Sequence, residues 1–230
     1  MKALITGASR GIGKAIVSEL ANNSWDLTLI SSGEKELFQF VSELQQKHSH
    51  LTINYLICDL KNPLERQQLF KKINSDMPLD LLVNNVGIYR ENKSSETDYH
   101  ELQEMLEVNL FAAVELSKYL LPTLKKSQCA CIVNIGSVMS INAAPFASNY
   151  SISKHALKAW TDALRAELRE QGVKVCGIYP GAVDTSSWDV STANKQEMIH
   201  PTDIAKLVAL IPSFSKSTLV EEIKISPLNF

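Results

Sequence analysis

The chain carries, near its start, the stretch Thr6-Gly7-Ala8-Ser9-Arg10-Gly11-Ile12-Gly13. It lies between a short apolar run and a segment of helical period, and its three glycines permit positive φ angles and a close approach of the backbone to a bound group. A helix N-terminus adds unpaired N–H groups and the positive end of a dipole. A tight turn formed only for packing is the alternative, but the place on the first βα unit favours a phosphate site. The residues of this stretch that we expect to bind a phosphate-containing cofactor are Gly7, Ser9, Arg10, Gly11, Ile12 and Gly13.

Short apolar runs alternate with amphipathic segments along the whole chain. The expected strands are residues 3–6, 27–30, 53–58, 79–84, 131–135, 173–179 and 220–225. The expected helices lie near residues 12–22, 34–47, 63–74, 98–121, 149–171 and 202–211. Strands separated by helices pair in parallel through right-handed crossovers, and uniformly apolar runs suit strands covered on both faces. The pattern predicts an α/β fold with one domain over residues 1–230: a Rossmann-type, doubly wound, seven-stranded parallel sheet with helices on both faces.

Composition and charge exclude several classes of protein. The 230 residues, 45% hydrophobic and 21% charged, are typical of one globular α/β domain and not of a disordered chain. A net charge of -2 without a basic block argues against a nucleic-acid partner. No apolar run approaches the roughly 20 residues that span a bilayer, and the opening strand leaves no room for a leader peptide, so we expect a cytoplasmic protein. The 4 cysteines form no CxxC pair and the histidines are dispersed, which predicts free thiols and no metal site.

Further motifs follow the glycine turn in a fixed order. They are Asn84-Asn85-Val86-Gly87 after the fourth expected strand, Asn109 in a helix, Ser137 after the fifth strand, the pair Tyr150 and Lys154, and Pro180-Gly181 after the sixth strand. With these motifs and the spacing Gly-x3-Gly-x-Gly, the chain resembles the short-chain dehydrogenase/reductase family, and its NADP-preferring carbonyl reductases, over nearly its whole length. It departs from that family at Val86 and Ile152, where Ala is frequent, and at Gly136, where Ser is frequent.

Asn109, Ser137, Tyr150 and Lys154 are the candidate catalytic residues. Tyr150 and Lys154 lie four apart on one helix face, and an ammonium within about 4–6 Å would lower the pKa of a phenol from about 10. Tyr150 is therefore the expected acid/base, while Ser137 resembles an oxyanion contact. The family resemblance implies that Lys154 also binds the nicotinamide ribose and that Asn109 anchors a water chain to Lys154. Taken singly, each residue also has a structural explanation, such as a turn cap for Ser137.

The end of the second expected strand bears on cofactor preference. An NAD site usually has an acid about 20 residues past the glycines, to bind the ribose 2′-hydroxyl. Here Ser31 and Ser32 stand at that place, and Glu34 begins a helix, where a carboxylate favours the dipole. With Arg10 nearby, this pattern predicts NADP(H) and makes NAD(H) the less expected cofactor, although Arg10 could also be a solvated loop cation. The resemblance implies further cofactor contacts at Asp59, Leu60, Asn85, Val86, Gly87, Tyr150, Lys154, Pro180, Gly181, Val183 and Thr185.

The polar segment at about residues 185–200 is expected to be a substrate lid, with a plain connector as the alternative. Predicted substrate contacts are Ser137, Met139, Tyr150 and Trp188, with Ile88, Tyr89 and Ala144 as further lining. This apolar lining favours a small or moderately sized, hydrophobic ketone, aldehyde or secondary alcohol, which exchanges a hydride with NADP(H). Two alternatives remain open: an enzyme similar to a 3-oxoacyl-[acyl-carrier-protein] reductase, and a catalytically silent NADP-binding sensor or scaffold. The family resemblance implies a homodimer or homotetramer.

Overall fold

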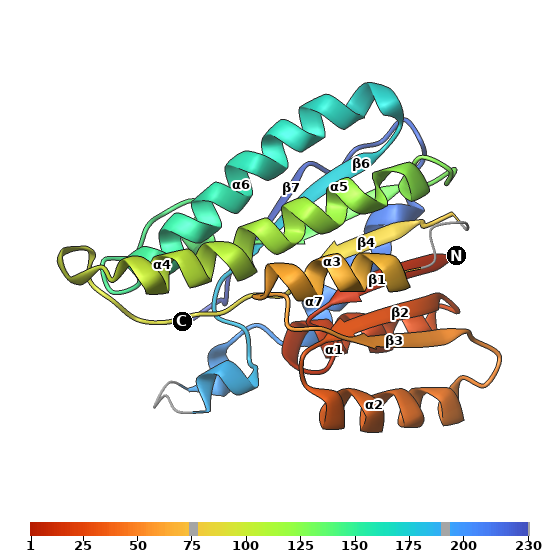
Figure 1. Ribbon diagram of the computed structural model, residues 1–230, viewed down its shortest axis with the longest axis horizontal. Helices are drawn as coiled ribbons and strands as arrows, with labels where there is room; N and C mark the ends of the chain where they lie inside the picture. The colour runs from red at the N-terminus through yellow and green to blue at the C-terminus, as the bar shows by residue number, and fades with distance from the viewer. Residues whose placement is uncertain (74–77, 190–193, 230) are drawn as a thin grey trace.

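The computed structural model describes residues 1–73, 78–189 and 194–229, and within them seven strands form one sheet (Figure 1). The strands are β1 (Lys2–Thr6), β2 (Asp26–Ser31), β3 (Ile53–Ile57), β4 (Leu81–Asn84), β5 (Cys131–Ile135), β6 (Lys174–Pro180) and β7 (Glu222–Ile225). All neighbours pair in parallel, in the order β3-β2-β1-β4-β5-β6-β7. The predicted doubly wound, seven-stranded sheet is confirmed, with strand ends shifted by up to two residues.

Seven α-helices cover the two faces of the sheet in the described residues. They are α1 (Gly11–Asn22), α2 (Glu34–Lys47), α3 (Pro63–Lys72), α4 (Tyr99–Leu106), α5 (Ala112–Leu124), α6 (Ser148–Leu168) and α7 (Pro201–Leu210). The side chains of β1 alternate between the faces: Ile5 packs into a core with α1, α2 and α7, and Leu4 into a second core with α3, α5 and α6. Residue 74 of the expected helix 63–74 lies outside the described residues. None of the described helices is both long and apolar enough to cross a membrane.

The expected helix 98–121 is interrupted, which the sequence did not predict. A π-helical turn at Glu107–Phe111 separates α4 from α5 and carries Asn109. The Asn109 side chain is buried and bonds both polar groups of Ile88: Oδ1 accepts from its N–H at 2.8 Å, and Nδ2 donates to its carbonyl at 3.0 Å. These two bonds hold Asn109 and its turn against the segment that follows β4. π-helical turns occur frequently at functional sites.

The strand order reverses between β1 and β4, and ligands of open α/β sheets bind beyond the carboxyl ends of the strands at such a point. The glycine turn follows β1 and Asn85 follows β4 at this edge of the sheet. Thr6 Oγ accepts the N–H groups of Asn85 and Val86 at 3.0 and 3.1 Å, and Asn85 Nδ2 donates to the Thr6 carbonyl at 2.9 Å. These bonds hold the two predicted cofactor loops together.

Candidate active site

The turn between β1 and α1 leaves its backbone open to a bound group. Gly7 and Gly11 have φ angles of +64° and +54°, and a Cβ on Gly13 would collide with the Gly7 carbonyl. In the described residues, no side chain caps the N-terminus of α1, and its first turn holds no acid. The N–H groups and the dipole of α1 are thus open to an anion. The Thr185 methyl lies 3.1 Å from the Cβ position of Gly11, so the loop after β6 closes against this turn.

Ser137, Tyr150 and Lys154 gather beyond the end of β5. The Ser137 side chain interacts with the Tyr150 hydroxyl in the direction that lowers the pKa of Tyr150. Lys154 Nζ lies 5.8 Å from the centroid of the Tyr150 ring and donates to the Ile135 carbonyl at 3.0 Å. Ser137 also caps the short turn Val138–Ser140 by accepting the Met139 N–H at 3.1 Å. Ser137 therefore caps a turn, which is the structural explanation considered for it, and also lies at the predicted position after β5.

Asn109 joins this group from the other side of Gly87. A Cβ on Gly87 would lie 3.3 Å from Asn109 Oδ1 and 3.4 Å from Lys154 Nζ. Asn109 Nδ2 donates to Ser153 Oγ at 2.9 Å, and Ser153 Oγ donates to the Tyr150 carbonyl at 2.8 Å. The structure thus brings all four predicted catalytic residues together and adds Ser153, which the sequence analysis missed. The available signal was a hydroxyl directly before Lys154.

The pKa values of this group differ from the sequence-based expectation. Burial raises the pKa of Tyr150 to about 12, although the Ser137 side chain acts in the opposite direction. Burial also lowers the pKa of Lys154 to about 8. The net shift of the Tyr150 pKa is therefore upward, opposite to the direction expected from Lys154. The ammonium lies over the ring and points to the Ile135 carbonyl instead of the phenol oxygen, so burial dominates.

The end of β2 provides hydroxyls where a ribose 2′-phosphate is expected. Ser9 Oγ and Ser31 Oγ are 2.8 Å apart, and Ser32 is exposed. Arg10 is also exposed, and its guanidinium donates to Ser186 Oγ at 3.3 Å. Glu36 also reaches this place, which the sequence analysis did not indicate. Its carboxylate folds back to within 2.9 Å of the Cβ position of Gly33.

Asp59 and Leu60 follow β3, where the resemblance implies an adenine pocket. The exposed Asp59 carboxylate accepts the Lys61 N–H at 3.0 Å, and Leu60 is buried. Arg66, only 1% exposed, donates to the Leu60 carbonyl at 2.7 Å and forms ion pairs with Glu107 and Glu115. Arg66, another residue not identified from the sequence, thus ties Leu60 to the π-helical turn that carries Asn109.

The remaining predicted residues lie in the loops after β5 and β6. Val183 is buried and pairs with Ile199, while Pro180 ends β6. A Cβ on Gly181 would lie 2.8 Å from Pro227 Cδ, so the C-terminal segment passes directly over this loop. Met139 and Trp188 are half-buried. Residues 190–193 of the expected lid lie outside the described residues.

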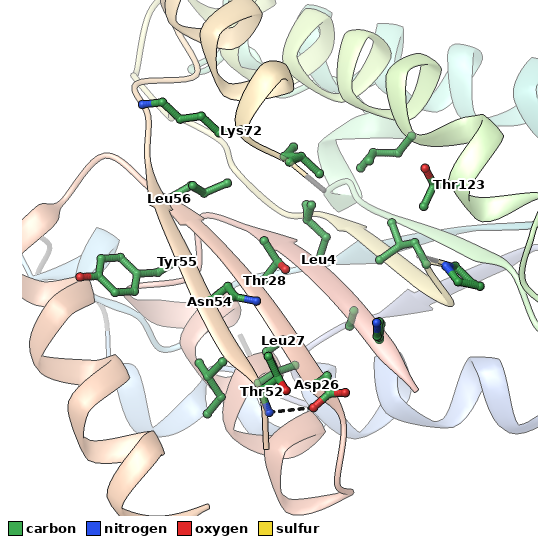
Figure 2. Close-up of a pocket in the computed structure, with 17 residues that line it drawn as sticks. Leu4, Asp26, Leu27, Thr28, Thr52, Asn54, Tyr55, Leu56, Lys72 and Thr123 are labelled. Carbon is green, nitrogen blue, oxygen red and sulfur yellow. Dashed lines mark hydrogen bonds between the residues drawn. The ribbon is translucent and has the colours of Figure 1, made fainter. Parts of the chain in front are cut away.

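A separate cavity of about 570 Å³ lies away from all of these residues (Figure 2). It is lined by the starts of β1, β2 and β3 and by the ends of α3 and α5, and a hydrogen bond of 2.8 Å from the Thr52 N–H to Asp26 lies at its edge. Parallel strands begin at one edge of a sheet and end at the other, so this cavity is at the edge opposite the candidate site. Across the described parts of the chain, no three His, Cys, Asp or Glu side chains form a group that suits a metal ion.

Comparisons with known proteins agree with this geometry. Residues 1–196 match the family described as short chain dehydrogenase. A 3-amino-tetrahydro-pyrrolizinone reductase of Xenorhabdus hominickii is 34% identical over 200 residues, which cover 85% of this chain and 66% of that relative. A ketoacyl reductase of Nostoc is 32% identical over 190 residues, which cover 82% of this chain and 66% of that relative. An alcohol dehydrogenase from Thermococcus sibiricus, solved in complex with 5-hydroxy-NADP, is 28% identical in sequence. Its structure superposes with a TM-score of 0.90 over 100% of this chain and 97% of that chain.

Proposed function

Because the chain belongs to the short-chain dehydrogenase/reductase family, we propose that it is an NADP(H)-dependent oxidoreductase that interconverts a hydrophobic ketone or aldehyde and its alcohol. The observation that carries this proposal is the grouping of Ser137, Tyr150 and Lys154 beyond the carboxyl end of β5. Two hydroxyls held together there can share one carbonyl oxygen. A proton donor at that point is what carbonyl reduction needs.

In the reductive direction, a bound nicotinamide supplies the hydride. The hydroxyls of Ser137 and Tyr150 donate hydrogen bonds to the carbonyl oxygen, stabilising the negative charge that develops on it. Tyr150 then gives its proton to that oxygen. Lys154 stabilises the resulting phenolate as a nearby cation, and a second of its three N–H groups is available to a ribose hydroxyl. Asn109 and Ser153 hold the helix of Tyr150 against the segment after β4.

The preference for NADP(H) is supported by the hydroxyl pair of Ser9 and Ser31 and by the exposed Arg10 at the glycine turn. No carboxylate stands at residues 31–33 to favour a free ribose 2′-hydroxyl. Arg10 donates one hydrogen bond to Ser186 Oγ, and a guanidinium has further N–H groups that could bind a 2′-phosphate. Residues 185–200 would then act as the lid over the substrate.

The substrate class follows from the groups beside Tyr150. The Tyr89 ring packs edge-on against the Tyr150 ring at a centroid distance of 5.1 Å and remains 42% exposed. This aromatic surface favours a hydrophobic carbonyl compound over a sugar. An acyl-carrier protein is an acidic partner, yet the lid cation Lys195 is already paired with Asp184 and Asp189. The 3-oxoacyl alternative is therefore the second candidate, supported by the relative from Nostoc. The enzyme would act as a homodimer or homotetramer.

Replacement of Tyr150 tests this proposal. Tyr150→Phe should lower the kcat for reduction of a hydrophobic ketone by at least about 100-fold, because the proton donor is lost. The Kd for NADPH, followed by its fluorescence, should change less than about twofold, since the hydroxyl contributes little to cofactor affinity. Tyr99→Phe, at an exposed ring on α4, is the matched control. Normal turnover by Tyr150→Phe would disprove the assignment, and faster reduction of a 3-oxoacyl thioester than of any simple ketone would favour the second candidate.

A further inference from the structure

The helix that carries Tyr150 lacks a cap of its own. α6 begins at Ser148, so Tyr150 is its third residue, and the residue before the helix is Ala147, which has no polar side chain. The first N–H groups of a helix have no partner within the helix and need acceptors from elsewhere. The position of Tyr150 therefore depends on what binds those groups.

Asn92 supplies two of the missing acceptors from a distant part of the chain. Its main-chain carbonyl accepts the Ser148 N–H at 3.2 Å, and its side-chain Oδ1 accepts the Asn149 N–H at 2.9 Å. The Asn92 N–H in turn donates to the Phe146 carbonyl at 2.9 Å. Asn92 thus accepts hydrogen bonds from the N–H groups of the two residues directly before Tyr150, and its own N–H fixes the loop that leads into α6.

The segment around Asn92 is itself fixed to the rest of the site. Four residues before Asn92, Ile88 is bonded through both its N–H and its carbonyl to the buried Asn109. Between them, Tyr89 packs against the Tyr150 ring. Beyond Asn92, the Thr97 hydroxyl donates to Asn149 Oδ1 at 3.3 Å. Asn92 is therefore held on both sides and can impose a position on the first turn of α6.

We propose that Asn92 is a positioning residue that caps α6 from outside the helix and so sets the distance of the Tyr150 hydroxyl from Ser137. This inference rests on the proposed function, because it takes Tyr150 to be the proton donor. Lys154 lies one turn further along and is anchored by the Ile135 carbonyl. Loss of the cap should therefore displace Tyr150 while Lys154 and the cofactor loops stay in place.

Asn92→Ala removes the side-chain acceptor, and Asn92→Asp keeps an oxygen at the same position. We expect Asn92→Ala to lower kcat by about tenfold to 100-fold, because small displacements of a reacting group are costly, with the KM for NADPH changed less than about twofold. Asn92→Asp should restore most of kcat. The matched control is Ser94→Ala, because the Ser94 hydroxyl donates to Ser148 Oγ at 2.8 Å and binds no main-chain N–H group of α6.

Amide hydrogen exchange provides a readout that does not depend on turnover. Asn92→Ala should speed exchange at Asn149, whereas Ser94→Ala should leave it near the wild-type rate. Unchanged exchange at Asn149 would overturn the cap, and faster exchange with an unchanged kcat would overturn its role in positioning Tyr150. Equal losses of kcat in Asn92→Ala and Ser94→Ala would overturn it as well. Failure of the proposed function appears separately, as turnover retained by Tyr150→Phe.

Discussion

The ring of Tyr179 occupies the space that a side chain at residue 136 would need. A Cβ on Gly136 would lie 2.5 Å from Tyr179 Cδ1, and a Cβ on Gly177 would also meet this ring. Tyr179 is only 1% exposed, and among the described residues its hydroxyl has no hydrogen-bond partner. The departure from the family at Gly136 thus has a physical cause, because the Tyr179 ring of β6 leaves no room for the frequent serine.

Gly136→Ser should therefore destabilise the protein although it introduces the residue that is frequent in the family. We expect the free energy of unfolding to fall by about 2–3 kcal/mol, as for other overpacked cores. In a Tyr179→Leu background the same substitution should cost less than about 1 kcal/mol, since the ring is gone. Urea denaturation of the wild type, the two single variants and the double variant measures the coupling between residues 136 and 179. An equal loss of unfolding free energy on Gly136→Ser in both backgrounds would contradict this prediction.

Tyr89 should affect selectivity between substrates. Tyr89→Ala removes the ring that packs against Tyr150, and an aromatic contact contributes about 0.5–1.5 kcal/mol, so kcat/KM for an aryl ketone should fall about twofold to tenfold. For a short aliphatic aldehyde we expect a smaller loss. Tyr89→Phe is the control, because the hydroxyl only makes a 3.4 Å bond to Glu91. If both variants lose activity equally on both substrates, Tyr89 does not contact the substrate.

Local features of this chain were predictable and distant contacts were not. The glycine turn, the strands and the spacing of Tyr150 and Lys154 follow from residues within one or two turns of each other. The bond from the Asn149 N–H to Asn92 joins residues 57 positions apart, so no local pattern indicates it. The π-helical turn at Glu107–Phe111 likewise depends on contacts with Ile88 that lie outside the helix. The pKa of Tyr150 depends on burial, which spacing along a helix does not give.

The lowered pKa of Lys154 predicts how reduction depends on pH. The ammonium form prevails below about 8 and is lost as the pH rises through that value, which removes the cation that stabilises the Tyr150 phenolate. The kcat/KM with NADPH as the varied substrate reports the free enzyme, and it should fall above about pH 8. Tyr150, with its pKa raised to about 12, stays protonated in this range. A flat profile to pH 9.5 would contradict this assignment, with stability at each pH checked by the melting temperature.

Glu36 should weaken the binding of a 2′-phosphate. Its Oε2 lies 2.9 Å from the Cβ position of Gly33, and Ser9 Oγ lies 3.8 Å from the same point. A phosphate bound at the hydroxyls of Ser9 and Ser31 would therefore approach a carboxylate of the same sign. Exposed charge pairs contribute about 0.2–1 kcal/mol, so Glu36→Gln should tighten the binding of 2′-phospho-ADP-ribose by up to about fivefold.

The matched control for this prediction is Glu34→Gln, since Glu34 lies in the same first turn of α2 and is also exposed. Titration calorimetry with ADP-ribose should give the same Kd for the wild type and both variants, because that ligand lacks the phosphate. Weaker binding of ADP-ribose to Glu36→Gln would show that Glu36 accepts a hydrogen bond from the ribose hydroxyl, and the preference for NADP(H) would then be wrong. Equal effects of the two variants on the phosphorylated ligand would instead assign the effect to net charge alone, because only Glu36 folds back over Gly33.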